Sequence, residues 1–149
     1  MAVHVKAPLA GTVVGLADVP DPVFSTAMVG PGLAIDPDRA PGTVVAPVSG
    51  TLVKLRPHAL VVVADGGRGV LVHLGIDTVK LDGEGFAVLA TEGDAVEVGQ
   101  PIVAWNPADV EARGLSPVCA VVALDAAADL VIDLASGPVD TGEPLFTWN

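Results

Sequence analysis

Two histidines, His58 and His73, have the residue type and the spacing that could carry a chemical reaction. An imidazole with an ordinary pKa of about 6.5 offers a free nitrogen lone pair on most molecules at neutral pH. One ring could attack a phosphoryl group while the other donates an N–H to the phosphoryl oxygens, since phosphoryl transfer depends mainly on positioning and charge stabilisation. Two other interpretations stay open: a metal site, although zinc normally takes more than two protein ligands, or two half-buried histidines without a reaction to perform.

The segment between these histidines is typical of a β-hairpin. Asp65-Gly66 lies between two Val-rich runs, and this pair suits a type I′ turn because both central residues of that turn need positive φ. A turn at these two residues places His58 directly opposite His73 in the ladder, with Cβ atoms about 4.5–5.5 Å apart. The prediction depends on register, because a wider loop would shift the pairing and a slip of one residue would turn one ring to the other face.

Short strands, rather than alternating strands and long helices, are expected to position the two rings. The chain has 17 glycines and 13 prolines, which separate short runs rich in valine. Such runs predict an all-β fold, an antiparallel β-sandwich or barrel, with one or two short helices. One helix is expected over residues 106–113, because Asn106 can cap it, Pro107 suits its first position and Gly114 can end it. A second short turn of helix is expected within residues 125–130.

Three pairs of short segments repeat along the chain and keep their glycines at the same places. Three pairs are too few for a solenoid, so they indicate one compact sandwich built from two related halves. The pairs are residues 7–14 (APLAGTVV) with 46–53 (APVSGTLV), 30–35 (GPGLAI) with 83–88 (GEGFAV), and 96–103 (VEVGQPIV) with 139–146 (VDTGEPLF).

The composition indicates a single domain, residues 1–149, without a nucleic-acid partner. A chain of 149 residues fits one domain, and its 51% of hydrophobic residues can fill a core. The net charge of −11, from 18 acidic and 7 basic side chains, would repel a polyphosphate backbone and attract a basic protein partner. No uninterrupted apolar stretch approaches the roughly 20 residues of a membrane span.

Cysteine usage and the N-terminal residues favour a cytoplasmic protein. Cys119 is the single cysteine, so no internal disulfide can form and a reducing compartment is the simpler interpretation. The apolar neighbours of Cys119 predict a small buried hydrophobic residue. Residues 1–6 (MAVHVK) lack the charged region and the long apolar run of a secretory signal.

Residues 72–78 (VHLGIDT), followed by 83–86 (GEGF), resemble the active-site strand of the glucose-type enzyme IIA component of the bacterial phosphoenolpyruvate-dependent sugar phosphotransferase system. Residues 19–30 (VPDPVFSTAMVG) and 45–51 (VAPVSGT) are similar to the same family, and the resemblance runs from about residue 7 to residue 146. It implies a β-sandwich with internal duplication, of the duplicated hybrid motif type.

The resemblance also implies a function for each histidine. The family residue that matches His73 receives a phosphoryl group from the small carrier HPr and passes it to a cysteine of the IIB domain of a glucose-family permease, written IIB or IIBC. The family residue that matches His58 holds the phosphoryl group by hydrogen bonding. No cofactor is required, and the membrane is reached only through the permease. Some family members also bind regulatory protein targets, and a zinc ion can then be shared by the two histidines and a partner carboxylate.

Four further residues are candidates for contact with partners. Asp77 lies four residues beyond His73 and, on a continuing strand, would point to the same face; the family places the matching aspartate at the rim of the site. Asp21 has a similar family role, and Asp-Pro is equally an ordinary turn dipeptide. Phe24 and Val23 are candidates for an apolar docking patch, with core packing as the competing use. Met28 is considered for the same patch and is assigned to the core.

Gly75 has a predicted supporting function. A glycine two residues after His73 lets the backbone come close, so its carbonyl oxygen could accept the N–H of one ring nitrogen. That contact would fix the tautomer and leave the second ring nitrogen free to attack.

Two other classes of protein fit parts of the sequence. His73 and Asp77 have the His-x-x-x-Asp spacing of a lysostaphin-like zinc peptidase, but such a peptidase also needs a His-x-His element, which a chain with three histidines at positions 4, 58 and 73 does not have. A biotinyl or lipoyl carrier would need a lysine at a hairpin tip. The lysines are Lys6, Lys54 and Lys80, and none of them is in such a tip motif.

Overall fold

Residues 2–149 are described by a computed structural model in which short antiparallel strands dominate. The prediction of an antiparallel all-β fold with one or two short helices is confirmed. The longest of the described helices has six residues, so none of them could cross a bilayer. The strands are β1 (Val3–Lys6), β2 (Gly11–Gly15), β3 (Gly32–Pro37), β4 (Gly42–Val45), β5 (Gly50–Arg56), β6 (Ala59–Val63), β7 (Gly69–Leu74), β8 (Phe86–Val88), β9 (Ala95–Val96), β10 (Pro101–Trp105), β11 (Cys119–Ala123), β12 (Val131–Ile132), β13 (Pro138–Val139) and β14 (Pro144–Trp148). The helices are α1 (Pro22–Ser25), α2 (Pro107–Ala112) and the 3₁₀ turns η1 (Leu16–Asp18), η2 (Thr78–Leu81) and η3 (Ala128–Leu130).

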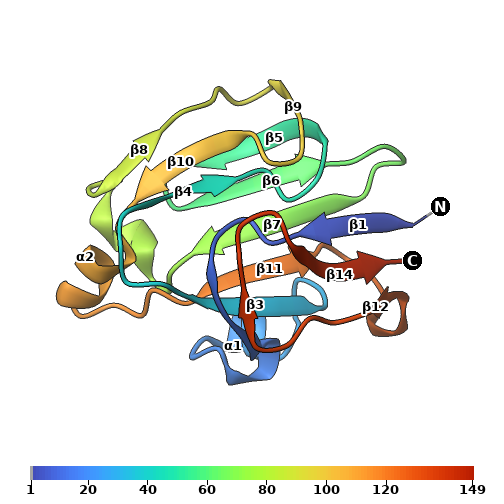
Figure 1. The fold of residues 1–149 in the computed structure, drawn as a ribbon, viewed down its shortest axis with the longest axis horizontal. Helices are drawn as coiled ribbons and strands as arrows, with labels where there is room; N and C mark the ends of the chain where they lie inside the picture. Colours follow the sequence, from blue (N-terminus) through green and yellow to red (C-terminus); the bar gives the residue numbers. More distant parts are fainter. Residues whose placement is uncertain (1) are drawn as a thin grey trace.

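The strands of residues 2–149 form one large sheet and two small ones (Figure 1). The large sheet has eight strands in the order β13-β2-β3-β11-β7-β6-β5-β9, and the small sheets have the orders β1-β14-β12 and β4-β10-β8. Apolar residues from all three sheets meet in one core, to which β7 contributes Val70, Val72 and Leu74. Alternation along β7 therefore directs Leu71 and His73 to the outer face of the large sheet.

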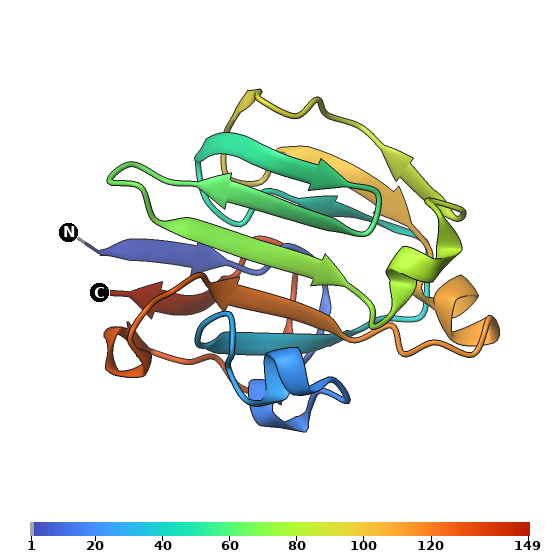
Figure 2. The same ribbon diagram turned by 180° about the vertical axis from the view of Figure 1, so that it is seen from behind.

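A second, smaller core covers part of that outer face. It joins Leu16 of η1 and Phe24 of α1 to Ala120 and Val122 of β11. Figure 2 shows α1 lying against this face, beside β3 and β11. Every residue of β11 is buried because both of its faces are covered, which explains why its sequence is a continuous apolar run. Cys119 lies in this strand with no exposed surface, as predicted, and burial raises the pKa of its thiol to about 12.

Pairing of the strands reproduces the internal duplication for two of the three repeats. β13 pairs with β2 at the start of the first half, just as β9 pairs with β5 at the start of the second. β14 pairs with β1 in the same way as β10 pairs with β4. The echo between residues 30–35 and 83–88 does not correspond to structure, because β3 lies in the large sheet and β8 in a small one. In the first segment, Gly30 and Gly32 allow close approach to the backbone of β11, whereas in the second, Gly83 and Gly85 take positive φ in the turn before β8.

The hairpin between the two histidines forms with a wider loop than predicted. Val63 pairs with Gly69, so the connection spans residues 64–68, and Ala59 stands opposite His73. The predicted pairing of His58 with His73 is therefore wrong by one residue. Its physical cause is the second glycine after Asp65, because Gly66 and Gly67 both take positive φ, 89° and 84°, and widen the turn.

Both predicted helical segments are present. Asn106 accepts a hydrogen bond from the backbone N–H of Ala108 at 3.1 Å and caps α2, Pro107 occupies the first turn, and Gly114 follows with φ of 84°. The second segment forms only the 3₁₀ turn η3 (Ala128–Leu130).

Candidate functional site

The rings of His58 and His73 meet at one end of the large sheet. Their centroids are 5.3 Å apart and their planes are nearly perpendicular, at 75°. His73 is the second-last residue of β7, whereas His58 lies in the turn between β5 and β6. A residue in a turn is not bound by strand alternation, which lets His58 approach His73 although Ala59 is the ladder partner. The backbone carbonyl of His58 accepts the N–H of Leu74 at 2.7 Å and fixes this turn against β7.

The predicted contact between Gly75 and His73 is present. Nδ1 of His73 lies 2.6 Å from the carbonyl oxygen of Gly75, so a proton on Nδ1 is donated to that oxygen. Gly75 has φ of 79°, and an added Cβ would lie 2.6 Å from Cγ2 of Thr78 and 3.0 Å from the carbonyl oxygen of Ser116. Both the backbone conformation and the space around it require glycine. With Nδ1 protonated, Nε2 carries the free lone pair of the ring.

Both histidines are held towards the neutral form. Burial lowers the pKa of His73, while the Gly75 carbonyl and the negative charges of Asp21 and Asp77 act in the opposite direction. Burial also lowers the pKa of His58, and the neighbouring His73 and Arg56 lower it further. Neutral imidazoles keep a nitrogen lone pair available, as a nucleophile requires.

Asp77 and Asp21 lie near enough to His73 for their charges to act on it, but neither is on a continuing strand. β7 ends at Leu74, and Asp77 takes a left-handed conformation with φ of 60° before η2. The strand-based reason for the position of Asp77 is therefore wrong. Asp21 caps α1, where its carboxylate accepts the backbone N–H of Val23 at 2.9 Å, so its turn function is present together with its nearness to the site.

The three apolar candidates for the docking patch differ in exposure. Phe24 is only 5% exposed and packs against His73, so it takes the competing core role rather than a place on the surface. Val23 is 41% exposed and remains available to a partner. The assignment of Met28 to the core is wrong, because Met28 is 72% exposed. α1 (Pro22–Ser25) is a single turn of helix, and Phe24 is its one buried residue.

A metal site would need ligands from elsewhere. Among residues 2–149, no group of three or more His, Cys, Asp or Glu side chains is placed to hold a metal ion. The two imidazoles supply two nitrogen donors, fewer than the three or four protein ligands that zinc normally takes.

Sequence reasoning did not single out Thr78, which is the one buried polar side chain among the described residues. Its hydroxyl donates to the carbonyl oxygen of Leu74 at 2.7 Å. The available signal was its place at the end of the VHLGIDT segment, a hydroxyl residue directly after a short loop.

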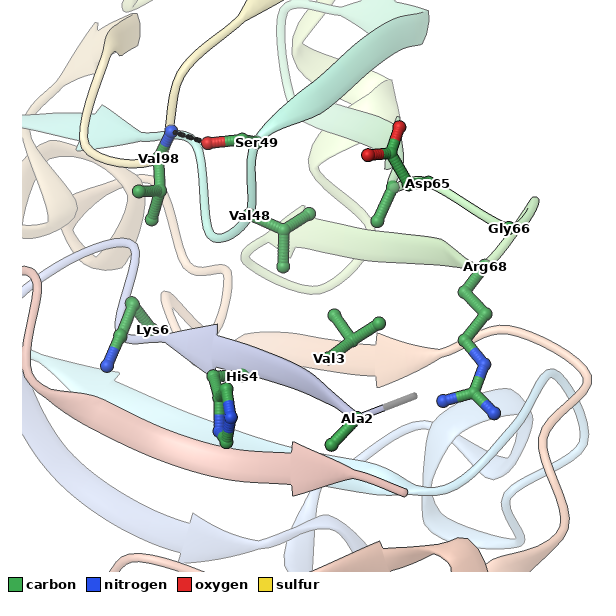
Figure 3. A pocket seen from close by; sticks show the side chains of 11 residues that line it. Ala2, Val3, His4, Lys6, Val48, Ser49, Asp65, Gly66, Arg68 and Val98 are labelled. Atoms are coloured by element: carbon green, nitrogen blue, oxygen red, sulfur yellow. Dashed lines mark hydrogen bonds between the residues drawn. The ribbon is translucent and has the colours of Figure 1, made fainter.

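A cavity lies at the opposite end of β7, near the chain termini. It has a volume of about 550 Å³ and is lined by residues of β1, of the 64–68 loop and of the turns at Ser49 and Val98 (Figure 3). His4 lines this cavity and is an exposed residue of β1. The histidine pair is therefore a surface site rather than the floor of this cavity.

Several known proteins of one family are similar to this chain. Residues 3–128 match the family described as phosphoenolpyruvate-dependent sugar phosphotransferase system, EIIA 1. A PTS system glucose-specific EIIA component of Staphylococcus aureus is 47% identical over 106 residues, which cover 70% of this chain and 63% of that relative. A protein of the same description from Halalkalibacterium halodurans is 44% identical over 120 residues, covering 79% and 68%.

The match to the staphylococcal relative thus spans less than two thirds of that protein's length. A solved structure, glucose permease IIA from Mycoplasma capricolum, superposes with a TM-score of 0.93 at 31% identity and covers 100% of this chain and 97% of its own. Since the family match extends over residues 3–128, the chain belongs to the EIIA 1 family of the phosphoenolpyruvate-dependent sugar phosphotransferase system.

Proposed function

We propose that this protein is a cytoplasmic phosphocarrier for sugar uptake, in which Nε2 of His73 accepts a phosphoryl group from the phosphohistidine of HPr. The observation that carries the proposal is the 2.6 Å contact between Nδ1 of His73 and the Gly75 carbonyl, because it commits the proton to Nδ1 and the lone pair to Nε2. Family membership supports the same conclusion.

In the proposed step, the Nε2 lone pair forms a bond to phosphorus while the bond from phosphorus to the HPr imidazole breaks, and the electron pair of that bond stays on the leaving nitrogen. The ring of His73 gains positive character, which the Gly75 carbonyl oxygen and the carboxylates of Asp21 and Asp77 stabilise. Neutral His58, with its ring centroid 5.3 Å from that of His73, donates an N–H to a phosphoryl oxygen.

The onward step passes the phosphoryl group to a cysteine thiolate of a IIB domain in a glucose-family permease. The step uses imidazole nitrogens and needs no cofactor, and any zinc ion shared by His58 and His73 would require further ligands from a partner. The net charge of −11 favours encounter with a basic partner surface, and phosphorylation adds about −1.5 to −2 more charge near the site. Regulatory partners that distinguish the two phosphorylation states would respond to this change.

The test is incubation with phosphoenolpyruvate, enzyme I and HPr, followed by intact-protein mass measurement. We expect one phosphoryl group on the wild type and on His4→Ala, and none on His73→Ala. His4 is the matched control, since it is an exposed histidine at the far cavity. A phosphorylated His73→Ala protein would overturn the assignment.

His58→Ala separates acceptance from onward transfer. We expect this variant to gain the phosphoryl group and to pass it slowly to the IIB cysteine, because the hydrogen bond that holds the group is lost. Undiminished transfer would contradict the role of His58. The zinc-peptidase alternative gains no support from the site, which lacks a third protein ligand among residues 2–149.

A further inference from the structure

The loop that follows His73 is held by one side chain that the proposed reaction does not use. Thr78 has no exposed surface, and its Oγ1 donates to the carbonyl oxygen of Leu74 at 2.7 Å. Leu74 is the last residue of β7, and its own N–H donates to the backbone carbonyl of His58 at 2.7 Å. The Thr78 hydroxyl therefore bonds the carbonyl of the peptide unit between Leu74 and Gly75, while the N–H of Leu74 makes the bond that fixes the turn carrying His58.

The methyl group of Thr78 lies beside the backbone of the same loop, at Gly75. A Cβ added to Gly75 would lie 2.6 Å from Cγ2 of Thr78, so this methyl lies directly beside the Gly75 backbone. Two residues of the loop, Gly75 and Asp77, have left-handed φ of 79° and 60°, conformations that need support from outside the loop when the residue is not glycine. Thr78 closes the loop with its hydroxyl and limits the movement of Gly75 with its methyl.

We propose that Thr78 is a positioning residue that keeps the Gly75 carbonyl oxygen on Nδ1 of His73. Through that contact, Thr78 holds the imidazole in the tautomer with Nε2 unprotonated. The expected effect of Thr78 on the rate of phosphorylation rests on the proposed phosphocarrier function. The expected effect of Thr78 on the tautomer of His73 does not.

Thr78→Val tests the hydroxyl at almost constant shape. The substitution leaves the buried Leu74 carbonyl without its partner, a change that the loop can relieve only by moving. We expect the ring ¹⁵N shifts of neutral His73 to move from the Nδ1–H tautomer towards the Nε2–H tautomer. The phosphorylation kcat should fall about tenfold with KM for phospho-HPr nearly unchanged, because the nucleophile is mispositioned while the docking surface is intact.

Thr78→Ser keeps the hydroxyl and removes the methyl, so it should lie between the wild type and Thr78→Val in both measurements. Thr51→Val is the matched control, since Thr51 is exposed on β5 and its substitution should change neither. Val62→Ala, in the main core, controls for general loss of stability and should leave the His73 tautomer unaltered.

Unchanged His73 ring shifts in folded Thr78→Val would overturn the proposal. If Thr78→Val does not fold, Thr78→Ala decides, because it also removes the hydroxyl that bonds the Leu74 carbonyl: a tautomer shift supports the proposal and wild-type shifts refute it. If the wild type accepts no phosphoryl group, the proposed function fails, while the ring shifts still test the positioning by Thr78.

Discussion

The phenyl ring of Phe24 packs against the imidazole of His73, with centroids 5.1 Å apart and planes tilted by 55°. Phe24 is 5% exposed and belongs to the smaller core that lies on the outer face of the large sheet. Burial is the largest cause that lowers the pKa of His73. The contact therefore links α1 directly to the protonation state of the proposed phosphoryl acceptor.

Replacement of Phe24 by alanine should raise the pKa of His73 towards the ordinary value of about 6.5, because water reaches the ring. The same change removes a buried aromatic side chain and should reduce the free energy of unfolding by about 3 kcal/mol. Proton chemical-shift titration of His73 measures the first effect and urea unfolding the second. Phe146→Ala is the control: Phe146 lies in the main core, so its loss should cost stability and leave the His73 titration in place. A folded Phe24→Ala protein with an unshifted His73 would refute the link.

The meeting of the two rings could be predicted from sequence, but the reason it occurs could not. Hydrophobic runs around Asp65-Gly66 correctly indicate the hairpin, yet Gly67 also takes positive φ and widens the loop. The wider loop shifts the pairing by one residue, so that Ala59 faces His73. If His58 were on a strand, this shift would turn its side chain to the other face of the sheet. His58 lies in the β5–β6 turn, so strand alternation does not fix the direction of its side chain. The conformation of this turn depends on tertiary contacts, such as the hydrogen bond from the Leu74 N–H to the His58 carbonyl, which the sequence does not show.

Other differences have a similar origin in tertiary contacts. The likeness of residues 30–35 to 83–88 does not mark equivalent positions, and only strand pairing shows that the two segments lie in different sheets. Met28 is apolar and was expected inside, but it lies in a bend after the end of α1 and is exposed, while the buried residue of α1 is Phe24. Gly75, by contrast, was predictable because its function depends on local backbone geometry within two residues of His73.

Gly75→Ala should impair phosphorylation much more than Gly99→Ala, although both glycines have positive φ. Gly75 and Gly99 have φ of 79° and 87°, so alanine costs about 1–2 kcal/mol at either position. Only at Gly75 does the new Cβ also collide with Thr78 and with the Ser116 carbonyl, while nothing lies within 4 Å at Gly99. We expect the Gly75 carbonyl to move off Nδ1, with loss of phosphoryl acceptance in Gly75→Ala and wild-type rates in Gly99→Ala. Equal rates in the two variants, measured with phospho-HPr, would contradict the function of this carbonyl.

Asp21→Asn and Asp77→Asn should each lower the pKa of His73 further, because each removes a negative charge that favours the imidazolium form. Asp77 is exposed and Asp21 is half-buried, so salt should weaken the effect, more for Asp77 than for Asp21. Titration of His73 by NMR at low and at high ionic strength measures both. Asp65→Asn, at the far hairpin loop, is the control and should leave His73 unchanged. A His73 pKa that rises in either site variant would show that the carboxylate acts in another way.

The lowered pKa values of His58 and His73 also predict how stability depends on pH. In the unfolded chain both imidazoles have a pKa of about 6.5, whereas in the folded protein their pKa values are lower, so the folded protein takes up the two protons only at lower pH. Between those values the unfolded state holds more protons, so the free energy of unfolding rises with pH and falls as pH drops below about 6.5. Urea unfolding from about pH 7.5 down to about pH 5.5, above the range of ordinary carboxylates, measures this slope. His73→Gln should reduce the slope, because one of the two linked groups is gone. A flat profile in the wild type would mean that the folded state accommodates both imidazolium ions, and the neutral nucleophile would then lack its physical basis.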